Sequence, residues 1–145
     1  MKGPVKVFLD TSVLIAASDA EHPDHERSRP LLAAATPYTT ACAAHTLAEV
    51  YAVLSRLPAA KRQRPELAGL LVEQIIGRMA VVSLTVEEYV ATIHKTTQSL
   101  LAGGIVFDAL LLACARKVEA EWIYTWNLRH FRMVAPDLAE RIVTP

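Results

Sequence analysis

The sequence is poor in cysteine and contains no long hydrophobic run. It has only two cysteines, Cys42 and Cys114, which are too few for a disulfide framework and do not form a metal-ligand motif. We expect both to be buried as small hydrophobic residues in the reducing cytoplasm. No stretch approaches the ~20 apolar residues of a membrane span, and the polar residues 10–12 interrupt the apolar N-terminal stretch, unlike a signal peptide. We therefore expect a cytoplasmic protein with no membrane partner.

Neither sign of charge is in excess, because 15 Lys and Arg residues balance 15 Asp and Glu residues. This balance argues against a protein that coats nucleic acid by bulk electrostatics, since such domains usually have a pI above about 9. Any chemistry on nucleic acid must therefore come from a local site. The 145 residues, 52% of them hydrophobic, suit one folded domain over residues 1–145. The apolar surplus also indicates a surface that a partner covers.

Short apolar runs alternate with helical patterns of 10–15 residues, which is typical of βαβ units and predicts an α/β fold with a mainly parallel sheet. We expect about five strands, at residues 5–9, 38–40, 80–84, 122–125 and 132–134. We expect one helix that begins near residue 13 and a short helix through residues 31–33. Further helices are expected at about 43–57, 66–77, 85–101 and 107–118. Loops are expected at 22–29 and 58–65, and Thr85 with Glu88 predicts a capping box at the start of the helix at 85–101. The pattern does not reveal the strand order.

Two acidic residues stand in apolar surroundings. Asp108 is the only polar residue between positions 105 and 115, and a buried carboxylate without a partner is costly. It is either a first-turn acid held by the helix dipole or a functional group, that is, a metal ligand or a catalytic acid. Asp10 directly follows the first expected strand, and ligands bind at the carboxyl ends of parallel strands. An N-cap role for Asp10 is equally open and compatible with ligand binding.

The other candidates are weaker when taken alone. Glu49 shares a helical face with His45, opposite the apolar stripe of its helix, and this pattern favours a solvated face with a His45–Glu49 pair. Thr125 and Asn127 follow the fourth expected strand, where they would present oxygen atoms to the same edge as Asp10 or serve as turn and cap residues. Such hard oxygen donors suit Mg²⁺ or Mn²⁺ better than Zn²⁺. Metal-assisted phosphodiester hydrolysis is the natural chemistry of such a site.

Four blocks of sequence connect these residues. They read FLDTSVLI at 8–15, HTLAEVY at 45–51, FDALL at 107–111 and TWNLRHF at 125–131. In this order they resemble the PIN-domain ribonucleases and, within them, the VapC toxins of bacterial toxin–antitoxin pairs. The resemblance implies a three-layer α/β/α sandwich around a parallel sheet. It also implies an acidic pocket that binds Mg²⁺ or Mn²⁺ through the carboxylates of Asp10, Glu49 and Asp108.

The sequence departs from the family pattern at two positions. A fourth acidic position of many relatives falls at Asn127, which can offer a carbonyl oxygen but cannot act as an anionic ligand or base. Another acid often lies three residues further on, where this chain has His130. We therefore expect catalysis by Asp10, Glu49 and Asp108 with Asn127 beside them, and a weakened second metal position. Further polar contacts are expected from Thr11, Ser12, Thr125 and His130.

An acidic pocket repels RNA, so binding must use basic groups nearby, although each is as easily a solvated surface residue. The candidates are Arg56, Lys61, Arg62, Arg64, Arg129 and Arg132. The resemblance implies an RNA substrate, a homodimer, and a small antitoxin whose tail blocks the pocket. The main alternative is a catalytically weak or inactive PIN-like module that binds RNA or protein. A dehalogenase-type phosphatase would need a second Asp where Ser12 stands, and a receiver domain would need adjacent acids and a late Lys.

Overall fold

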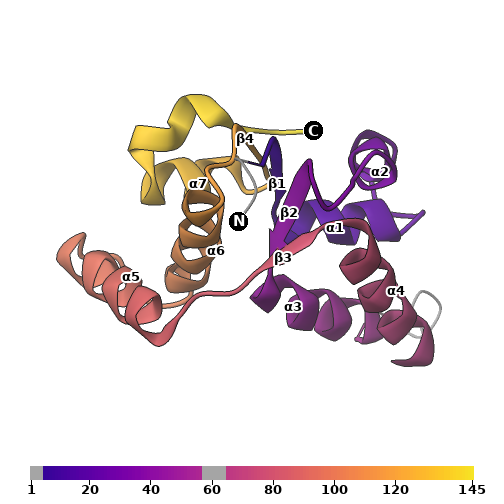
Figure 1. Ribbon diagram of the computed structural model, residues 1–145, viewed down its shortest axis with the longest axis horizontal. Coiled ribbons are helices and arrows are strands. Elements are labelled where there is room, and N and C mark those ends of the chain that lie inside the picture. Colours follow the sequence, from indigo (N-terminus) through magenta and orange to yellow (C-terminus); the bar gives the residue numbers. More distant parts are fainter. Residues whose placement is uncertain (1–4, 57–64) are drawn as a thin grey trace.

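The computed structural model describes residues 5–56 and 65–145 (Figure 1). The strands are β1 (Val7–Leu9), β2 (Thr40–Ala43), β3 (Ala80–Val82), β4 (Trp122–Tyr124) and β5 (Ile142–Val143). The α-helices are α1 (Thr11–Ser18), α2 (His25–Ala33), α3 (Ala44–Ser55), α4 (Pro65–Arg78), α5 (Val86–Gln98), α6 (Ile105–Lys117) and α7 (Leu128–Val134). A 3₁₀ helix, η1 (Pro136–Arg141), precedes β5. This alternation confirms the predicted α/β class.

The five strands form one parallel sheet in the order β3-β2-β1-β4-β5. The chain starts at the central strand β1, adds β2 and β3 on one side, and then crosses to add β4 and β5 on the other. The strand order therefore reverses between β1 and β4. In open parallel sheets this switch point, at the carboxyl ends of the strands, is where ligands bind. Asp10 follows β1 and Thr125 follows β4, so both residues lie at the switch point.

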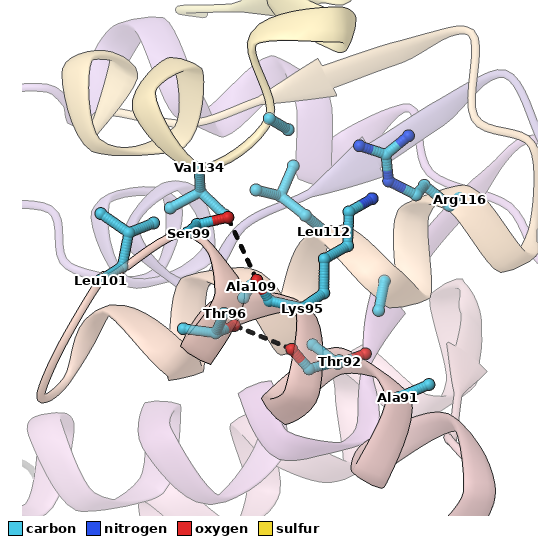
Figure 2. Close-up of a pocket in the computed structure, with 12 residues that line it drawn as sticks. Ala91, Thr92, Lys95, Thr96, Ser99, Leu101, Ala109, Leu112, Arg116 and Val134 are labelled. Carbon is cyan, nitrogen blue, oxygen red and sulfur yellow. Dashed lines mark hydrogen bonds between the residues drawn. The ribbon is translucent and has the colours of Figure 1, made fainter.

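Helices cover both faces of the sheet, which confirms the three-layer arrangement. Apolar residues of α1, α3 and α4 pack on one face, and those of α6 and α7 pack on the other. Helix α5 lies outside these layers beside α6 (Figure 1) and has no buried residue. A cavity of about 210 Å³ opens between α5, α6 and the end of α7, with Lys95 and Arg116 at its polar side (Figure 2).

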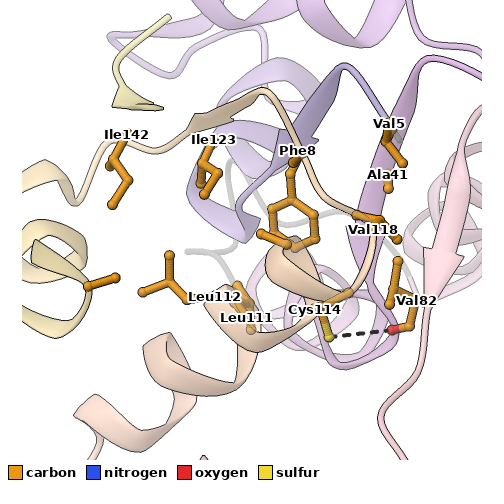
Figure 3. Close-up of a cluster of buried hydrophobic side chains, with 14 of the residues drawn as sticks. Val5, Phe8, Ala41, Val82, Leu111, Leu112, Cys114, Val118, Ile123 and Ile142 are labelled. Atoms are coloured by element: carbon orange, nitrogen blue, oxygen red, sulfur yellow. Dashed lines mark hydrogen bonds between the residues drawn. The ribbon is translucent and has the colours of Figure 1, made fainter. Parts of the chain in front are cut away.

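The core follows from the two-residue period of the strands. Phe8 of β1 and Ile123 of β4 point to the α6 side, where they meet Leu111 and Leu112 (Figure 3). Their neighbour Leu9 points to the opposite cluster around α1 and α3. Both cysteines are buried, as predicted, one in each cluster. A sheet whose strands are buried on both faces explains part of the apolar surplus of the sequence.

Three predicted elements differ from the structure. Residues 132–134 were expected to be a strand but form the last turn of α7, which buries Phe131 and ends just before Pro136; the final strand is Ile142–Val143. Helix α2 begins at His25, inside a segment expected to be a loop, and tolerates Pro30 in its interior. Strand β2 begins at Thr40 and continues to Ala43, beyond the expected range of 38–40.

The other predicted helices are confirmed with small shifts of their ends, including the capping box of Thr85 and Glu88 that begins α5. The loop expected at 58–65 lies outside the described residues except for Pro65, the first residue of α4. Among the residues that the structure describes, no helix has the length and apolar character needed to cross a membrane.

Candidate active site

Asp10 lies where β1 passes into α1, and it caps that helix. Its Oδ1 accepts a 2.7 Å hydrogen bond from the backbone N–H of Thr11, and its Oδ2 accepts hydrogen bonds from Ser12 Oγ (2.7 Å) and Thr125 Oγ1 (2.8 Å). Only 3% of Asp10 is exposed. Burial raises the pKa of Asp10, and the hydrogen bonds oppose that rise. Since a carboxylate has about four acceptor positions, Asp10 can both cap the helix and accept a further ligand.

The hydroxyls that hold Asp10 are themselves fixed by the chain after β4. Ser12 Oγ accepts a 3.0 Å hydrogen bond from the backbone N–H of Trp126, and Thr125 Oγ1 accepts one of 2.9 Å from the backbone N–H of Asn127. Each hydroxyl therefore has its hydrogen directed at Asp10. This network joins the ends of β1 and β4 across the switch point and orients the carboxylate.

Glu49 is held by a second hydroxyl chain. Thr11 Oγ1 donates a 2.8 Å hydrogen bond to Glu49 Oε1, so the fully buried Thr46, whose Oγ1 lies 2.8 Å from Thr11 Oγ1, must be the donor to Thr11. His45 Nε2 lies 4.0 Å from the same carboxylate oxygen. The solvent-facing pair expected from the helix pattern is thus present, and the same carboxylate also reaches the site.

Asp108 lies in the first turn of α6 and is half-buried. Burial, and then the neighbouring carboxylates of Asp10 and Glu49, raise the pKa of Asp108 to about 6, while His130 opposes the rise. No hydrogen bond to this carboxylate is found within the described part of the chain. Asp108 therefore experiences the negative charge of the other two acids without the donors that stabilise Asp10.

These carboxylates line one cavity of about 190 Å³, which we call the acidic pocket. Its lining residues are Asp10, Thr11, Ser12, Ile15, Glu49, Val53, Phe107, Asp108, Leu111 and Asn127. Within residues 5–56 and 65–145, no group of three His, Cys, Asp or Glu side chains is drawn together closely enough to form a ready-made metal site. The acids share the pocket, but their oxygen atoms do not converge on a single point.

Asn127 is an exposed lining residue of this pocket, and His130 lies nearby without lining it. Asn127 precedes α7, lines the acidic pocket and makes no side-chain cap of that helix, so its amide is available to the pocket. His130, one turn into α7, is exposed and close enough to Asp108 to affect its pKa. The segment after β4 thus brings a neutral amide and an imidazole to the positions where the family resemblance implied acids.

The candidate RNA-binding residues are more scattered. Arg56 ends α3 and is exposed, Arg129 is exposed between Asn127 and His130, and Arg132 donates a 2.9 Å hydrogen bond to the carbonyl of Ile142. Three further candidates lie outside the described residues, namely Lys61, Arg62 and Arg64. Arg129 is therefore the described basic residue nearest in sequence to the pocket.

The cavity beside α5 does not compete as a catalytic site (Figure 2). Its serine and threonine hydroxyls donate to carbonyls of α5 itself, and Arg116 forms a two-bond ion pair with Asp137 at 2.8 and 2.9 Å. No carboxylate is among its described lining residues. The carboxylates that could support catalysis line the acidic pocket instead.

The sequence did not single out Thr46 or Phe107, which both belong to the site. A signal for Thr46 was present, because this polar residue falls one helical turn before Val50 on the buried side of α3, where an unsatisfied hydroxyl would be costly. Phe107 carries no such signal, since an aromatic residue in an apolar run is indistinguishable from a core residue.

Fold and pocket together define a parallel α/β protein with a three-carboxylate site at the switch point of its sheet. The PIN domain family model matches residues 7–135, and the chain belongs to the PIN-domain family. It is 34% identical over 122 residues to ribonuclease VapC27 of Mycobacterium tuberculosis, covering 83% of each chain. The resemblance inferred from the four sequence blocks is thereby confirmed.

Solved structures support the fold. The chain is similar to VapC20 of Mycobacterium tuberculosis, described as a sarcin-ricin loop cleaving toxin, with a TM-score of 0.69, 20% identity, and coverage of 84% of this chain and 90% of that one. It is also similar to VapBC2 of Rickettsia felis, bound there to a promoter DNA fragment, with a TM-score of 0.60, 19% identity, and coverage of 96% and 97%.

Proposed function

We propose that this chain is a metal-dependent endoribonuclease that acts as the toxin of a toxin–antitoxin pair. The observation that carries the proposal is the convergence of Asp10, Glu49 and Asp108, from three separate segments, on one pocket at the switch point of the sheet. Membership of the PIN-domain family and the similarity to a VapC ribonuclease support this chemistry. We further propose that residues 1–145 form a single nuclease domain.

The donor set of the pocket fits a hard divalent cation. Carboxylate oxygens are the ligands that Mg²⁺ and Mn²⁺ prefer. A cation would oppose both causes of the raised pKa of Asp108, which are burial first and then repulsion from Asp10 and Glu49. We infer that Asp10 and Asp108 hold the ion directly and that Glu49 contacts it directly or through water. The separation of the acids suits Mg²⁺, which usually keeps several waters and few protein ligands.

Each residue then has a defined task in hydrolysis. A bound divalent ion supplies Lewis-acid activation of the phosphate and of the attacking water. Ser12 and Thr125 hold the Asp10 carboxylate in place, and Thr11 orients Glu49 so that its free oxygen can direct a water. Asn127 offers a neutral amide at the rim, where it can donate to a phosphate oxygen. In-line attack by water would leave a 5′-phosphate and a 3′-hydroxyl.

Substitution of the acids tests this proposal. We expect Asp10→Asn and Glu49→Gln to reduce the single-turnover rate of RNA cleavage by about 10² or more, because each removes a charge that organises the reacting groups. Asp137→Asn is the matched control, since that carboxylate pairs with Arg116 away from the pocket. Unchanged cleavage by Asp10→Asn would contradict the assignment, as would products ending in a cyclic 2′,3′-phosphate.

The alternative is a PIN-like module with little or no catalysis, which the amide of Asn127 and the imidazole of His130 in place of acids would favour. An inactive module would still bind RNA or a protein partner but would cut none of a panel of RNAs with Mg²⁺ or Mn²⁺. Restoring an acid with Asn127→Asp distinguishes the two cases. A gain of activity would indicate that the neutral amide limits the native site.

The molecule also has surface suited to partners. Large apolar side chains are exposed on α4 and α5 at Leu67, Leu70, Ile76, Val86, Val90 and Ile93. We propose that these faces serve a second copy of the chain and an antitoxin whose tail occupies the acidic pocket, as the family resemblance implies. The similarity in fold to the VapBC2 structure is compatible with such an assembly.

A further inference from the structure

A second cavity lies beside the acidic pocket. This flanking cavity, of about 230 Å³, is formed where β2 and β3 end and where α3, α5 and α6 approach each other. The side chain of Leu111 lines both cavities, so they are direct neighbours. On its inner side the flanking cavity is closed by core residues, including Val82 and Cys114, whose thiol donates to the Val82 carbonyl (Figure 3).

A stacked pair of rings stands between the two cavities. His45 lines the flanking cavity and Phe107 lines the acidic pocket, and their rings are parallel with centroids 5.4 Å apart. Phe107 is 47% exposed and is therefore not a core residue. Tyr89 of α5 contributes another ring to the flanking cavity and is 39% exposed. Three aromatic rings thus line the two neighbouring cavities, two in the flanking cavity and one in the acidic pocket.

The chemistry of the flanking cavity differs from that of the acidic pocket. Its described lining residues include no carboxylate, so it would not bind the ion that the neighbouring acids attract. The surfaces it offers are flat rings and aliphatic side chains. The first residues of α3 also line this cavity. The N-cap of α3 is an alanine without a side-chain cap, and the N–H groups in the first turn of a helix have no partner within that helix. Such groups can donate to the carbonyl oxygens of a planar heterocycle.

We propose that the flanking cavity binds an unpaired nucleobase of the RNA, that of the nucleotide next to the phosphate in the acidic pocket. The inference rests on the proposed ribonuclease function. Sequence-tolerant stacking on aromatic side chains is the usual way in which proteins hold unpaired bases. A base in this cavity would stack on His45 and Tyr89 while its phosphate lies beside Phe107 and the acids. The substrate is then RNA that is single-stranded at the cleaved position, because a paired base could not enter.

Binding to two oligomers of equal charge tests the proposal. One is a fluorescein-labelled single-stranded RNA hexamer of mixed sequence, and the other has the same ribose-phosphate backbone without bases. Fluorescence anisotropy gives both dissociation constants with Mn²⁺ present, in an Asp108→Asn background that prevents cutting. We define the base ratio as the dissociation constant of the oligomer without bases divided by that of the RNA hexamer. Because the two oligomers have equal numbers of phosphates, this ratio isolates the contribution of the bases.

We expect the base-bearing hexamer to bind more tightly, and Tyr89→Leu and His45→Leu each to reduce that ratio by about fivefold or more, as the loss of one stacked base would. Two control variants should leave the ratio unchanged. Tyr89→Phe keeps the ring, and Tyr38→Leu removes an exposed ring that lies just before the amino end of β2, away from both cavities. Thermal melts test whether each variant is folded, and the partial exposure of Tyr89 leads us to expect that the two variants at that position are.

A ratio near one in the parent chain overturns the inference, as does a reduction below fivefold in both ring-removing variants. These outcomes are separable from failure of the proposed function. If the wild-type chain cuts RNA but the ratio does not depend on His45 or Tyr89, the ribonuclease stands and the base site is wrong. If the wild-type chain cuts no RNA while the ratio depends on both rings, the base site stands and the ribonuclease assignment is wrong.

Discussion

At the scale of single residues, Asp10 and Asp108 show how differently one fold can treat two carboxylates. Asp10 is almost fully buried but accepts three hydrogen bonds, from Thr11, Ser12 and Thr125. Asp108 is less buried and has no such donors among the described residues, so nearby negative charge acts on it directly. Asp10 is therefore a carboxylate held in a fixed orientation, and Asp108 is the acid whose charge a bound cation would stabilise most.

Removing the hydroxyl of Thr125 should destabilise the protein. Thr125→Val keeps the shape of this fully buried side chain but deletes a hydrogen bond to a charged group, which contributes about 1.5–3 kcal/mol. The pKa of Asp10 should rise further, because a contact that lowers it is lost. Urea unfolding at pH 7.5 measures the effect. Thr125→Ser retains the hydroxyl, and an equal loss in both variants would refute the role of the hydrogen bond.

Asp108 should make the metal-free protein less stable at neutral pH. Its pKa is raised from 3.8 to about 6 in the folded state, so between these values the folded chain holds a proton that the unfolded chain has released. Stability then falls as pH rises from about 4 to 6. Asp108→Asn removes this cost, and we expect the variant to melt at a higher temperature than wild type at pH 7.5 in EDTA, with a smaller difference at pH 4.

The opposite sign is expected at a carboxylate outside the pocket. The hydrogen bonds from Arg116 lower the pKa of Asp137, so its stabilising contribution is present above the ordinary pKa and is lost as the pH falls. Asp137→Asn should therefore not raise the melting temperature at pH 7.5. If Asp108→Asn also fails to raise it, the electrostatic conflict in the acidic pocket is absent.

At the scale of elements, the sequence predicted helices α1 to α6, α2 only in part, and missed the two short helices α7 and η1. The capping box of Thr85 and Glu88 marked the start of α5 correctly. The short final strand at Ile142–Val143 has only two residues, too few for any periodic pattern, and the apolar run before it was mistaken for a strand although it completes α7. Glu49 could not be chosen from its helix pattern, because its partner Thr11 is distant in sequence and close only in the fold.

Two helix ends lack the glycine that usually marks them. Leu100 and Glu119 follow α5 and α6 with φ values of 57° and 53°, a left-handed conformation that glycine adopts without strain. At α6, the N–H of Glu119 bonds to the carbonyl of Arg116 and that of Ala120 to the carbonyl of Ala115, which closes a Schellman motif. The sequence predicted that these helices end at about residues 101 and 118, close to the observed ends, but it did not predict the left-handed conformation.

Glu119→Gly should therefore stabilise the chain. Relief of the left-handed strain is expected to contribute about 1 kcal/mol, which corresponds to a rise of about 2–4 °C in melting temperature for a chain of this size. Calorimetry measures the shift. Glu119→Ala removes the same charge but keeps the strain, so it is the matched control. Equal melting temperatures for the two variants would show that the conformation costs nothing.

At the scale of the whole molecule, the strand order concentrates the chemistry. The chain begins in the middle of the sheet and builds outward on both sides, so the ends of β1 and β4 meet at the switch point, next to the starts of α1 and α7 and near Glu49 of α3. This arrangement depends on the order β3-β2-β1-β4-β5, which the sequence pattern did not reveal. The balanced net charge is thus compatible with an acidic pocket and basic residues spread elsewhere.

The central claim is that a divalent cation in the acidic pocket enables this chain to cut RNA. The most direct test measures single-turnover cleavage of a defined single-stranded RNA by the intact chain, first in EDTA and then with Mg²⁺ or Mn²⁺, beside Asp108→Asn. We predict no cleavage in EDTA, cleavage with either or both ions, and a rate at least about 10²-fold lower for Asp108→Asn. Cleavage at the same rate in EDTA, or at full rate by Asp108→Asn, would contradict the claim.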